Sequence, residues 1–347
     1  MDRNNQNQSP TIADVAQLAG VARSSVSRAL SDHPDVSREM KERVLRAAGQ
    51  LGYHPDFLAQ SLRSGATRTI GFIIRDISIP LFADIIKGAE QELESHGYST
   101  LLMNSFQDPA LEAKHISVLS RRRVDGLILS LASEVNTETI KALSRIQIPV
   151  VLLDRELNGV TTDSVGFDHA SGAYAAATSL LKVGHRRVGL ISGPMDIRPS
   201  RERLRGFVGA FEKAGISDWR ENVMEMHYFD PEFGEKATLA LLDKSLPPTA
   251  IVAGESQLGI GMLTALNRRG LRHGKDISIV ITDDLPLLHL MDPPVSVVYR
   301  DSEEMGRMAA ELLMRRLKNP KSKVVHEVLP TRFISRGSIT APLEELR

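Results

Sequence analysis

The strongest constraint on the fold of this chain is a regular alternation of apolar runs with amphipathic stretches, which begins at Thr69. Continuous apolar runs of strand length are typical of parallel sheets, because helices cover both faces of such sheets. The stretches between the runs carry apolar residues at helical spacing, as in ADIIKGAEQELESHG. The runs are TIGFII, STLLMN, GLILSL, PVVLLD, RVGLIS, TAIVAG, ISIVIT and VSVVY.

Eight or more strands exceed one comfortable sheet in a segment of this length. We therefore expect an α/β fold with two subdomains, each a doubly wound parallel sheet. Such folds bind ligands in the crevice at the carboxyl ends of the strands. The same fold class also includes Rossmann-type enzymes, so the fold by itself does not assign a function.

Composition excludes several classes of protein. The chain has 347 residues and no cysteine, which excludes disulfides, a thiolate nucleophile and a zinc–thiolate site. The first ten residues are polar and do not resemble a signal peptide, and no run of about 18 apolar residues is present. We therefore expect a cytoplasmic protein. The formal net charge is zero, so any prediction of DNA binding must come from a motif.

Residues 11–30, TIADVAQLAGVARSSVSRAL, predict two short helices joined by a tight turn. Thr11 can cap the first helix, and Asp14 completes a capping box three residues later. Gly20 ends this helix, because glycine adopts a left-handed conformation at little cost. Together the two helices form a helix-turn-helix, which is a DNA-binding element when its second helix is polar on one face.

The second helix presents a polar face suited to DNA. Val26 and Ala29 or Leu30 are its expected buried residues. Arginine can donate two hydrogen bonds to guanine, and serine suits phosphates or base edges. A plain helical hairpin with a solvated face is the alternative interpretation. The polar face consists of Arg23, Ser24, Ser25, Ser27 and Arg28.

A third helix and a short fourth segment follow. Ser37 is the expected N-cap of the third helix, and Gly52 is its expected end. The segment HPDFLAQSLRSG has Pro55 in a position that suits the first turn of a helix. It is too short to be a stable helix alone, so we expect it to fold only against a partner.

These motifs resemble the LacI/GalR family of bacterial repressors. The resemblance rests on TIADVAQLAGVARSSVSRAL, VSREMKERVLRAAGQLGYHP, LAQSLRSG and TIGFII, in this order and spacing. In that family, the hinge helices of two subunits pair and insert a leucine into the minor groove, which kinks the DNA. The matching leucine here is Leu62. An ordinary buried leucine is the alternative.

The resemblance implies a set of DNA contacts and shows one departure. Arg23, Ser24 and Arg28 are the expected base readers, while Ser25 and Ser27 are expected to contact phosphate. The residue that opens the recognition helix is commonly serine in the family, but here it is Ala22, which costs about 1 kcal/mol of capping. The full expected set is Thr11, Arg23, Ser24, Ser25, Ser27, Arg28, Leu58, Ala59 and Leu62.

The resemblance continues to the end of the chain and implies a periplasmic-binding-protein-like sensor. Its counterparts include IRDISIPLFADIIKGAE, RRRVDGLIL, GHRRVGLISGP, RLRGF and EEMGRMAAELL. The expected domains are a disordered tail (1–10), the headpiece (11–54), a hinge helix and linker (55–67), and an effector-binding and dimerisation domain (68–347). In the last, we expect an N-subdomain at about 68–168 and 300–325, and a C-subdomain at about 169–299 and 326–347.

Several polar residues follow the predicted strands and are candidates for an effector site. An arginine and a carboxylate that face each other suit a polyhydroxylated ligand, because each can bind two adjacent hydroxyls. A structural salt bridge is the alternative for Arg203 and Asp283, and a core position is the alternative for Phe82. Asp168 precedes a helix and is expected to cap it. The candidates are Asp76, Phe82, Asp154, Arg155, Arg203, Glu255 and Asp283.

The effector itself is only weakly indicated. Family members often carry Asn-Asp after the strand TAIVA, whereas Glu255 and Ser256 stand here. A sugar or sugar derivative is favoured, and a purine or nucleoside, or a corepressor, is the alternative. We find no H-x3-H pair for a metal, no G-x-G-x-x-G at the first strand–helix turn and no Walker lysine, so we expect no cofactor.

The sequence therefore predicts a repressor of a catabolic operon that leaves its pseudo-palindromic operator when a small molecule binds. The chain ends ITAPLEELR, without the tetramerising helix of some relatives, so we expect a homodimer. A sugar-binding transport protein is less favoured because it would not carry a headpiece. A Rossmann-type enzyme is less favoured because the phosphate-binding glycines are missing.

Overall fold

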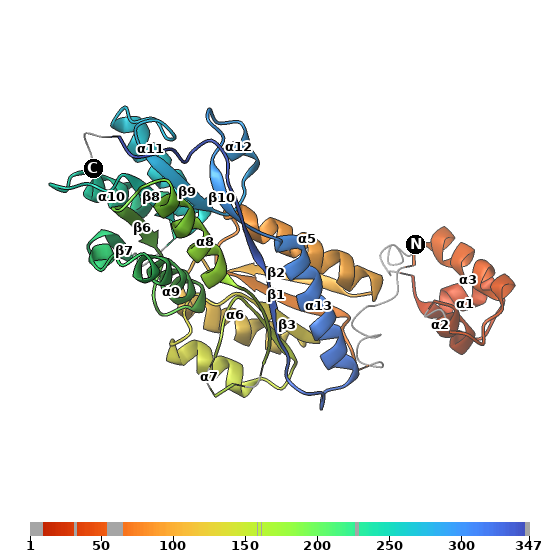
Figure 1. Ribbon diagram of the computed structural model, residues 1–347. Helices are drawn as coiled ribbons and strands as arrows, with labels where there is room; N and C mark the ends of the chain where they lie inside the picture. Colours follow the sequence, from red (N-terminus) through yellow and green to blue (C-terminus); the bar gives the residue numbers. More distant parts are fainter. Residues whose placement is uncertain are drawn as a thin grey trace, which may run out of the picture. The chain divides into compact units, whose positions relative to one another are not determined.

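The computed structural model describes residues 10–30, 33–53, 65–157, 159–160, 162–225 and 229–343. The chain divides after Thr67 into two compact units, a small helical one and a large α/β one (Figure 1). The predicted tail (1–10) lies almost entirely outside the described residues, and so does most of the predicted hinge. No helix among the described residues combines the length and apolar composition needed to cross a membrane.

The N-terminal unit contains the three predicted helices, α1 (Ile12–Ala19), α2 (Arg23–Leu30) and α3 (Arg38–Leu51). The side chain of Asp14 accepts hydrogen bonds from the backbone N–H and the hydroxyl of Thr11, both at 2.8 Å. Gly20 has a φ of 63°, in the left-handed region that glycine allows. Ser37 caps α3 by accepting from the N–H of Met40 at 3.3 Å. The predicted starts and ends of α1 and α3 are confirmed.

One small apolar core joins these three helices. All its fully buried residues are valine or alanine, so the helices approach one another closely around short side chains. Larger residues such as Ile12 and Leu51 close its edges. The buried residues are Val15, Ala16, Ala19, Val26, Ala29, Val44, Ala47 and Ala48.

The second unit contains two six-stranded sheets, which confirms the predicted fold class. The first has the order β11-β5-β4-β3-β1-β2, with all its pairs parallel. Its strands are β1 (Thr69–Ile74), β2 (Ser99–Asn104), β3 (Gly126–Leu129), β4 (Val150–Leu153), β5 (Asp163–Phe167) and β11 (His326–Leu329).

The second sheet repeats this order as β12-β10-β9-β8-β6-β7. Its pairs are parallel, except that β12 runs antiparallel to β10. In both sheets the first strand lies next to an edge strand, and the chain then crosses to its other side, so each sheet has a topological switch point, between β1 and β3 and between β6 and β8. The strands are β6 (Val188–Ser192), β7 (Val223–Glu225), β8 (Ala250–Ala253), β9 (Ser278–Thr282), β10 (Ser296–Arg300) and β12 (Thr331–Ile334).

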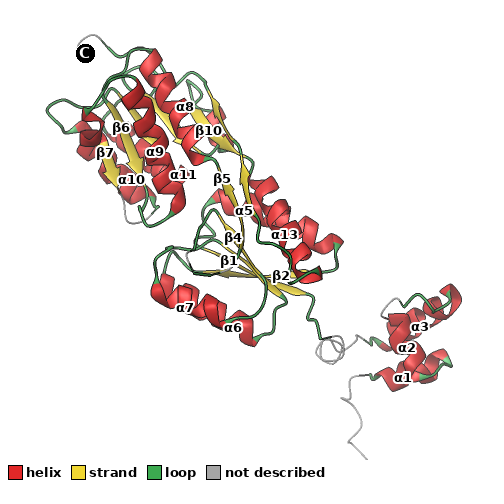
Figure 2. Ribbon diagram, turned by 60° about the horizontal axis from the view of Figure 1, so that its bottom comes forward, coloured by secondary structure: helices red, strands yellow, loops and turns green. Residues whose placement is uncertain are grey.

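Helices cover both faces of each sheet (Figure 2). On the first sheet, α5 (Pro80–Ser95) and α13 (Ser302–Lys318) share one apolar core, and α6 (Pro109–Arg121) and α7 (Thr137–Arg145) share the other. On the second sheet, α8 (His169–Lys182) and α9 (Arg198–Lys213) cover one face, and α10 (Pro231–Leu242) and α11 (Ser256–Arg268) cover the opposite face. The short helices η1 (Asp218–Asn222) and α12 (Pro286–His289) complete the unit.

Glycines bring three pairs of helices into backbone contact. A Cβ atom on Gly306 of α13 would overlap the carbonyl of Ile85 on α5, and one on Gly88 would overlap the carbonyl of Glu303. Gly206 of α9 lies in the same way against Ala170 of α8. Gly261 of α11 makes the same kind of contact with α10. These crossings therefore tolerate no side chain at the contact point.

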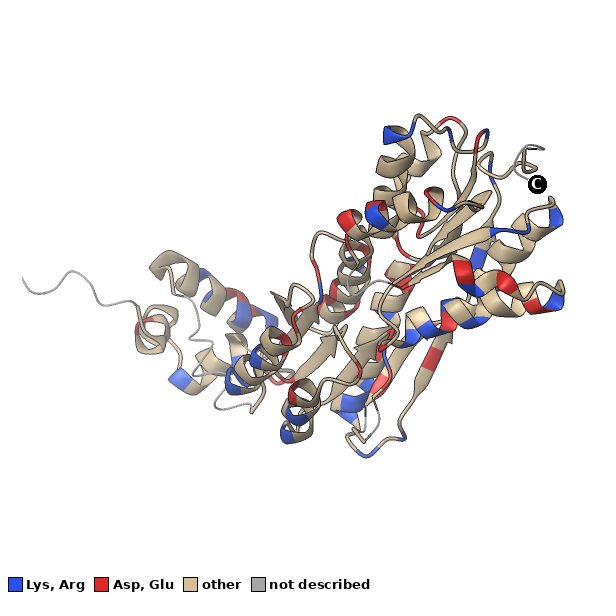
Figure 3. Cartoon of the chain, turned by 90° about the vertical axis from the view of Figure 1, so that its left-hand side faces the viewer, with Lys and Arg blue, Asp and Glu red and all other residues tan. Residues whose placement is uncertain are grey.

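The chain passes between the two sheets three times. The first passage lies between β5 and α8, where Asp168 caps α8 by accepting from the N–H of Ser171 at 3.0 Å, as predicted. The second follows Arg300. We predicted the third at about residue 326, but β11 still pairs with β5, so the passage lies at Pro330. Lys and Arg lie beside Asp and Glu along the helices of both units (Figure 3), in accord with zero net charge.

Candidate functional site

The first candidate surface is the polar face of α2. Val26 and Ala29 are buried in the helical core, while Arg23, Ser24 and Arg28 are exposed and Ser25 and Ser27 are half-buried. The carbonyl of Ala22 accepts from the N–H of Ser25 at 2.9 Å and that of Val26 at 3.1 Å. Ala22 thus opens the helix without a side-chain oxygen for its free amides. The predicted contacts Leu58, Ala59 and Leu62 lie outside the described residues.

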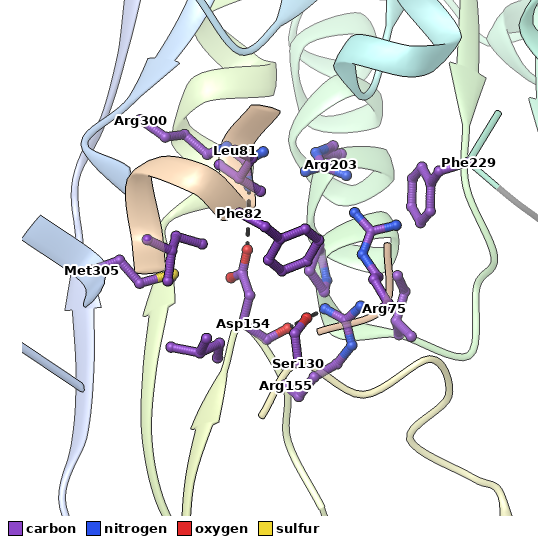
Figure 4. Close-up of a pocket in the computed structure, with 14 residues that line it drawn as sticks. Arg75, Leu81, Phe82, Ser130, Asp154, Arg155, Arg203, Phe229, Arg300 and Met305 are labelled. Atoms are coloured by element: carbon purple, nitrogen blue, oxygen red, sulfur yellow. Dashed lines mark hydrogen bonds and ion pairs between the residues drawn. The ribbon is translucent and has the colours of Figure 1, made fainter. Parts of the chain in front are cut away.

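The second candidate site is a cavity of about 20 Å³ between the two sheets of the sensor (Figure 4). Its polar residues follow strands of the first sheet, extend from α9, or lie at the end of β10. Arg75 follows β1 and Ser130 follows β3, so both lie at the switch point where doubly wound folds bind ligands. The lining residues are Arg75, Leu81, Phe82, Ile85, Ser130, Leu153, Asp154, Arg155, Ile197, Pro199, Arg203, Phe229, Arg300 and Met305.

A cluster of ion pairs centred on Asp154 and Arg300 forms one wall of this site. The carboxylate of Asp154 accepts from Nε2 of His169 at 2.8 and 2.9 Å, from the N–H of Phe167 at 3.1 Å, and from Nη1 of Arg300 at 3.3 Å. Arg300 also donates from Nε to Asp283 at 2.7 Å and from Nη2 to the same carboxylate oxygen. Arg300 therefore joins carboxylates from both sheets.

Burial and charge set the protonation of this cluster. Burial alone would raise the pKa of Asp154, but His169, Arg300 and Arg155 hold it well below the usual range. Burial lowers the pKa of His169 to about 4, despite the adjacent Asp154. His169 is therefore neutral at pH 7, and its Nε2 carries the proton that it donates to Asp154. Asp154 and Asp283 both have positive φ, at 56° and 81°, which is strained backbone for non-glycine residues.

Several buried polar atoms in and near the site have no partner among the described residues; of the four residues that carry them, Arg203 lines the cavity, whereas Asp283, Ser192 and Ser200 do not. Arg203 is 4% exposed, and its Nε and Nη1 have no acceptor. Oδ2 of Asp283, on the side away from Arg300, has no donor. The hydroxyls of Ser192 and Ser200 are also unpaired. Burying such groups costs about 1–3 kcal/mol each, so a cluster of them marks a place where a polar ligand would stabilise the protein.

A larger hollow of about 690 Å³ adjoins the cavity. Arg75, Arg155 and Phe229 line both spaces, so these side chains form the boundary between them. A pocket that holds a small molecule usually has at least about 300 Å³, so the cavity takes a ligand only when this boundary moves. The other residues of the hollow are Gln107, Pro109, Ala132, Ser133, Pro194, Met195, Asp196, Glu225 and Phe233.

Hydrogen bonds close the cleft between the two sheets beside the site. The side chain of Gln107 accepts from the N–H of Phe229 at 3.2 Å and donates to its carbonyl at 3.4 Å. The carboxylate of Glu134 accepts from the N–H of Arg198 at 2.9 Å and from Nη2 of Arg201 at 2.7 Å. Gln107 and Glu134 belong to the first sheet's half, and their partners to the second. These bonds hold the two halves together.

The structure brings most of the predicted effector residues together. Phe82, Asp154, Arg155 and Arg203 line the cavity, and Asp283 contacts it through Arg300. Arg155 donates to the carbonyls of Leu131 at 2.6 Å and Asp154 at 2.7 Å, so it also holds backbone in place. Glu255 is buried and accepts from the N–H of Gln257, and its burial raises its pKa.

One predicted residue lies elsewhere, and several lining residues were not predicted. Asp76 is half-buried, does not line the cavity and accepts from the N–H of Ser78 at 2.9 Å. The preceding residue, Arg75, lines it instead, because successive side chains of an extended chain point in opposite directions. Arg300 and Phe229 were also missed. The position of Arg300 at the end of a predicted strand was an available signal; Phe229 follows no predicted strand.

Comparison with known families assigns each of the two units to a described family. The family described as "Bacterial regulatory proteins, lacI family" matches residues 11–56. The family described as "Periplasmic binding proteins and sugar binding domain of LacI family" matches residues 67–335. Together the two matches cover nearly the whole chain.

Individual proteins give the same result. The chain is 31% identical over 329 residues to the ribose operon repressor of Haemophilus influenzae, which covers 95% of this chain and 98% of the relative. It is 33% identical over 308 residues to the HTH-type transcriptional repressor PurR of the same species, covering 88% and 91%. A solved complex of the transcriptional regulator CelR with cellobiose has a TM-score of 0.72 and 29% identity, covering 95% and 99%.

Proposed function

Because the chain belongs to the LacI family of bacterial regulatory proteins, we propose that two copies bind one pseudo-palindromic operator and release it when a small molecule occupies the sensor cleft. The matched families and relatives are regulators of transcription, so we assign the cleft a sensing role rather than a catalytic one. The protein would act in the cytoplasm, where the operator is located.

The observation that carries this proposal is that Arg203, which lines the cavity, and Asp283, which joins it through Arg300, are both buried and carry polar atoms without partners among the described residues. A guanidinium offers two parallel donors and a carboxylate offers two acceptors, so together they suit adjacent hydroxyls of a sugar or sugar derivative. The relatives' names support this ligand class, because they include a ribose operon repressor and a regulator in complex with cellobiose.

Coupling between the cleft and the DNA follows from the bonds that close the cleft. Gln107 and Glu134 hold the two halves of the sensor together. A ligand with different affinities for the open and closed cleft changes the population of these states by that difference. We propose that this change alters the spacing of the paired hinge segments, residues 55–67, and thereby weakens operator binding.

The proposed DNA contacts are those of the α2 face and the hinge. Arg23, Ser24 and Arg28 would read bases, Ser25, Ser27 and Thr11 would contact the backbone, and Leu58, Ala59 and Leu62 would act in the minor groove. The exposure of Arg23, Ser24 and Arg28 supports the first role. The hinge role rests on the resemblance to the family alone.

The test is operator binding by the full chain, measured by fluorescence anisotropy on its own upstream DNA and on a scrambled duplex. Arg23→Ala should weaken binding to the specific DNA by about 1–3 kcal/mol, because a base contact is lost. Arg38→Ala is the matched control, since Arg38 is exposed on α3 and pairs with Glu42 at 3.1 Å. Failure of the wild type to prefer its own DNA would overturn the proposal.

A second assay tests the cleft. Arg203→Ala should bind operator normally and no longer respond to a ligand that releases the wild type. Candidate ligands are screened by thermal unfolding, because a bound ligand stabilises the folded state. The screen includes nucleobases, since the rings of Phe82 and Phe229 line the cavity and aromatic rings stack on bases. A normal response in Arg203→Ala would remove the residue from the proposed site.

A further inference from the structure

Arg75 is a buried cation without an acceptor for one of its nitrogens. It follows β1 at the switch point of the first sheet and is 6% exposed. Its guanidinium carbon lies 4.4 Å from the ring centroid of Phe229 and 5.4 Å from that of Phe82 (Figure 4). Nη1 is buried and has no hydrogen-bond partner among the described residues. Ring contacts stabilise the charge but accept no directed N–H bond as strong as that of a carboxylate or phosphate.

The carboxylates of Glu255 and Asp283 lie near enough to act on the charge of Arg75, but neither accepts a hydrogen bond from its Nη1. Among the described lining residues, four arginines stand against one carboxylate, that of Asp154, which already accepts from His169 and Arg300. Arg155 donates to two backbone carbonyls, and Arg300 is paired with two aspartates. Arg75 and Arg203 thus remain with unpaired N–H groups that face one small space. Burial lowers the pKa of Arg75 to about 10, so it is still charged at pH 7.

We propose that the effector is an acidic sugar derivative, whose carboxylate or phosphate group pairs with Arg75 while its hydroxyls bind Arg203 and Asp283. This inference rests on the proposed function of the cleft. A neutral sugar would bury the guanidinium of Arg75 without an anion, whereas an acidic one would give it charge-assisted, bidentate hydrogen bonds.

The position of Arg75 also defines how such a ligand enters. Arg75 and Phe229 separate the small cavity from the larger hollow. Ser130 and Arg203 line only the cavity, and Gln107 and Asp196 only the hollow. A ligand that passes from the hollow into the cavity must cross the boundary formed by Arg75, Arg155 and Phe229. Its acidic group then draws the guanidinium away from Phe229, and the two spaces become one.

The experiment compares neutral and acidic molecules of the same skeleton. The probes are D-glucose, D-gluconate and D-glucose 6-phosphate, then D-ribose, D-ribonate and D-ribose 5-phosphate, at constant ionic strength. Inorganic phosphate and acetate serve as anions without a sugar skeleton. Binding to the full chain is measured by thermal unfolding, followed by the fluorescence of Trp219, the single tryptophan of the sequence. Comparison of the two acidic members separates a carboxylate from a phosphate ligand.

We expect at least one acidic probe to bind ten times more tightly than its neutral counterpart. Arg75→Met should abolish this preference, and Arg75→Lys should retain part of it. The unfolding temperature of Arg75→Met without ligand is measured first, so that a lost preference is assigned to the ligand contact and not to a loss of fold. Arg75→Lys, which keeps a positive charge beside Glu255, is the variant used if Arg75→Met does not fold. Arg68→Met is the matched control: Arg68 precedes the same strand and lies over the ring of Tyr98, away from the cavity.

Three results would overturn the inference. The first is equal affinity for the neutral and acidic members of a series. The second is a preference for acidic probes that persists in Arg75→Met. The third is that no probe, including phosphate and acetate, stabilises the wild type more than Arg75→Met. Operator binding without ligand is measured in parallel. If the wild type does not bind its operator selectively, the proposed function is wrong. If operator binding is normal and neutral sugars release wild type and Arg75→Met equally, only the acidic ligand is wrong.

Discussion

The two units of this protein place their candidate functional residues in opposite environments. In the helical unit, Arg23, Ser24 and Arg28 are exposed on a core of valine and alanine. In the sensor, Arg203 and Asp283 are buried and partly unpaired. Exposed side chains that contact DNA have little effect on the free energy of unfolding, whereas an unpaired buried charge lowers it until a ligand binds. Function and stability are therefore separable in the first unit and coupled in the second.

Glycine shows the same contrast. Gly49 lies within α3, and an added Cβ would meet no other atom within 4 Å. Gly306 lies within α13, where an added Cβ would overlap the backbone of α5. The helical unit thus has room at its glycine, and the sensor has none at this crossing. Substitutions at matched positions should separate the two units clearly.

The largest effect should follow from breaking the paired wall of the sensor site. Arg300→Leu leaves the carboxylate of Asp283 without its guanidinium and weakens the pairing of Asp154. Removing one partner of a buried ion pair costs about 3–5 kcal/mol. Urea unfolding followed by Trp219 fluorescence should show this loss.

Arg307→Leu is the control for this substitution. Arg307 lies on α13, where it pairs with Glu304 and Glu311 of the same helix, and exposed pairs contribute about 0–1 kcal/mol. Equal urea midpoints for Arg300→Leu and Arg307→Leu would contradict the coupling of charge burial to stability in the sensor.

A second effect concerns pH. Glu112 is a buried residue of α6. Its carboxylate accepts from the N–H of Ala132 at 2.8 Å and from the hydroxyl of Thr139 at 3.1 Å, and burial raises its pKa to about 7. Between the unfolded value of 4.5 and pH 7, the folded chain holds a proton that the unfolded chain has lost. The stability from this group is therefore complete below pH 4.5 and is lost as pH rises to 7, by about 3 kcal/mol.

Glu112→Gln should remove this dependence of the unfolding free energy on pH, because the amide mimics the protonated acid at every pH. The measurement is the difference in unfolding free energy between wild type and variant across pH 4.5–8. The difference isolates Glu112 from His169, whose lowered pKa acts in the opposite direction. A difference that does not change with pH would show that Glu112 is ionised throughout.

The glycine contrast gives the third prediction. Gly306→Ala forces α13 away from α5 and should destabilise the sensor by about 1–3 kcal/mol, in the range of overpacked cores. Gly49→Ala should instead stabilise the helical unit by about 0.5–1 kcal/mol, because alanine is the better helix former. Trp219 fluorescence reports the first substitution, and amide hydrogen exchange of residues 33–53 reports the second. Effects of the same sign would refute the comparison.

The smallest effect should come from the uncapped start of α2. Ala22→Ser adds a side-chain acceptor for the free amides and should stabilise α2 by about 1 kcal/mol. Slower hydrogen exchange across residues 23–30, with an unchanged urea midpoint for the sensor, is the expected result. If exchange at α2 does not change, the missing cap is already compensated in the folded unit.

Much of the fold was predictable, because local patterns agree with the final packing. Each of the eight predicted apolar runs coincides with a strand, although β10 continues to Arg300, one residue beyond its run, and Thr11, Gly20 and Ser37 act at the helix ends as expected. The runs did not reveal β5, β7, β11 or β12. β5 begins with Asp163, which is buried only because Arg315 and Arg316 of α13 pair with it from 152 and 153 residues away. No local pattern encodes such a pairing.

The site was predictable only in part, for a similar reason. Following strand β4 to its carboxyl end identified Asp154 and Arg155, and the resemblance to the family identified Arg203; all three line the cavity. The same rule predicted Asp76 and not Arg75, because position after a strand does not reveal which of two successive side chains points into the cleft. The partners of Arg300 and the position of Phe229 depend on how the two sheets approach each other, and that arrangement is set by tertiary packing.

The three passages of the chain between the sheets have a mechanical consequence. They lie side by side: the N–H of Asp168 donates to the carbonyl of Leu329 at 2.9 Å, the hydroxyl of Thr331 donates to the carbonyl of Asp168 at 2.7 Å, and Thr331 pairs with Arg300. Three adjacent tethers resist sliding and separation but allow bending. We therefore expect the two halves of the sensor to move mainly by bending about these three segments, like the leaves of a hinge.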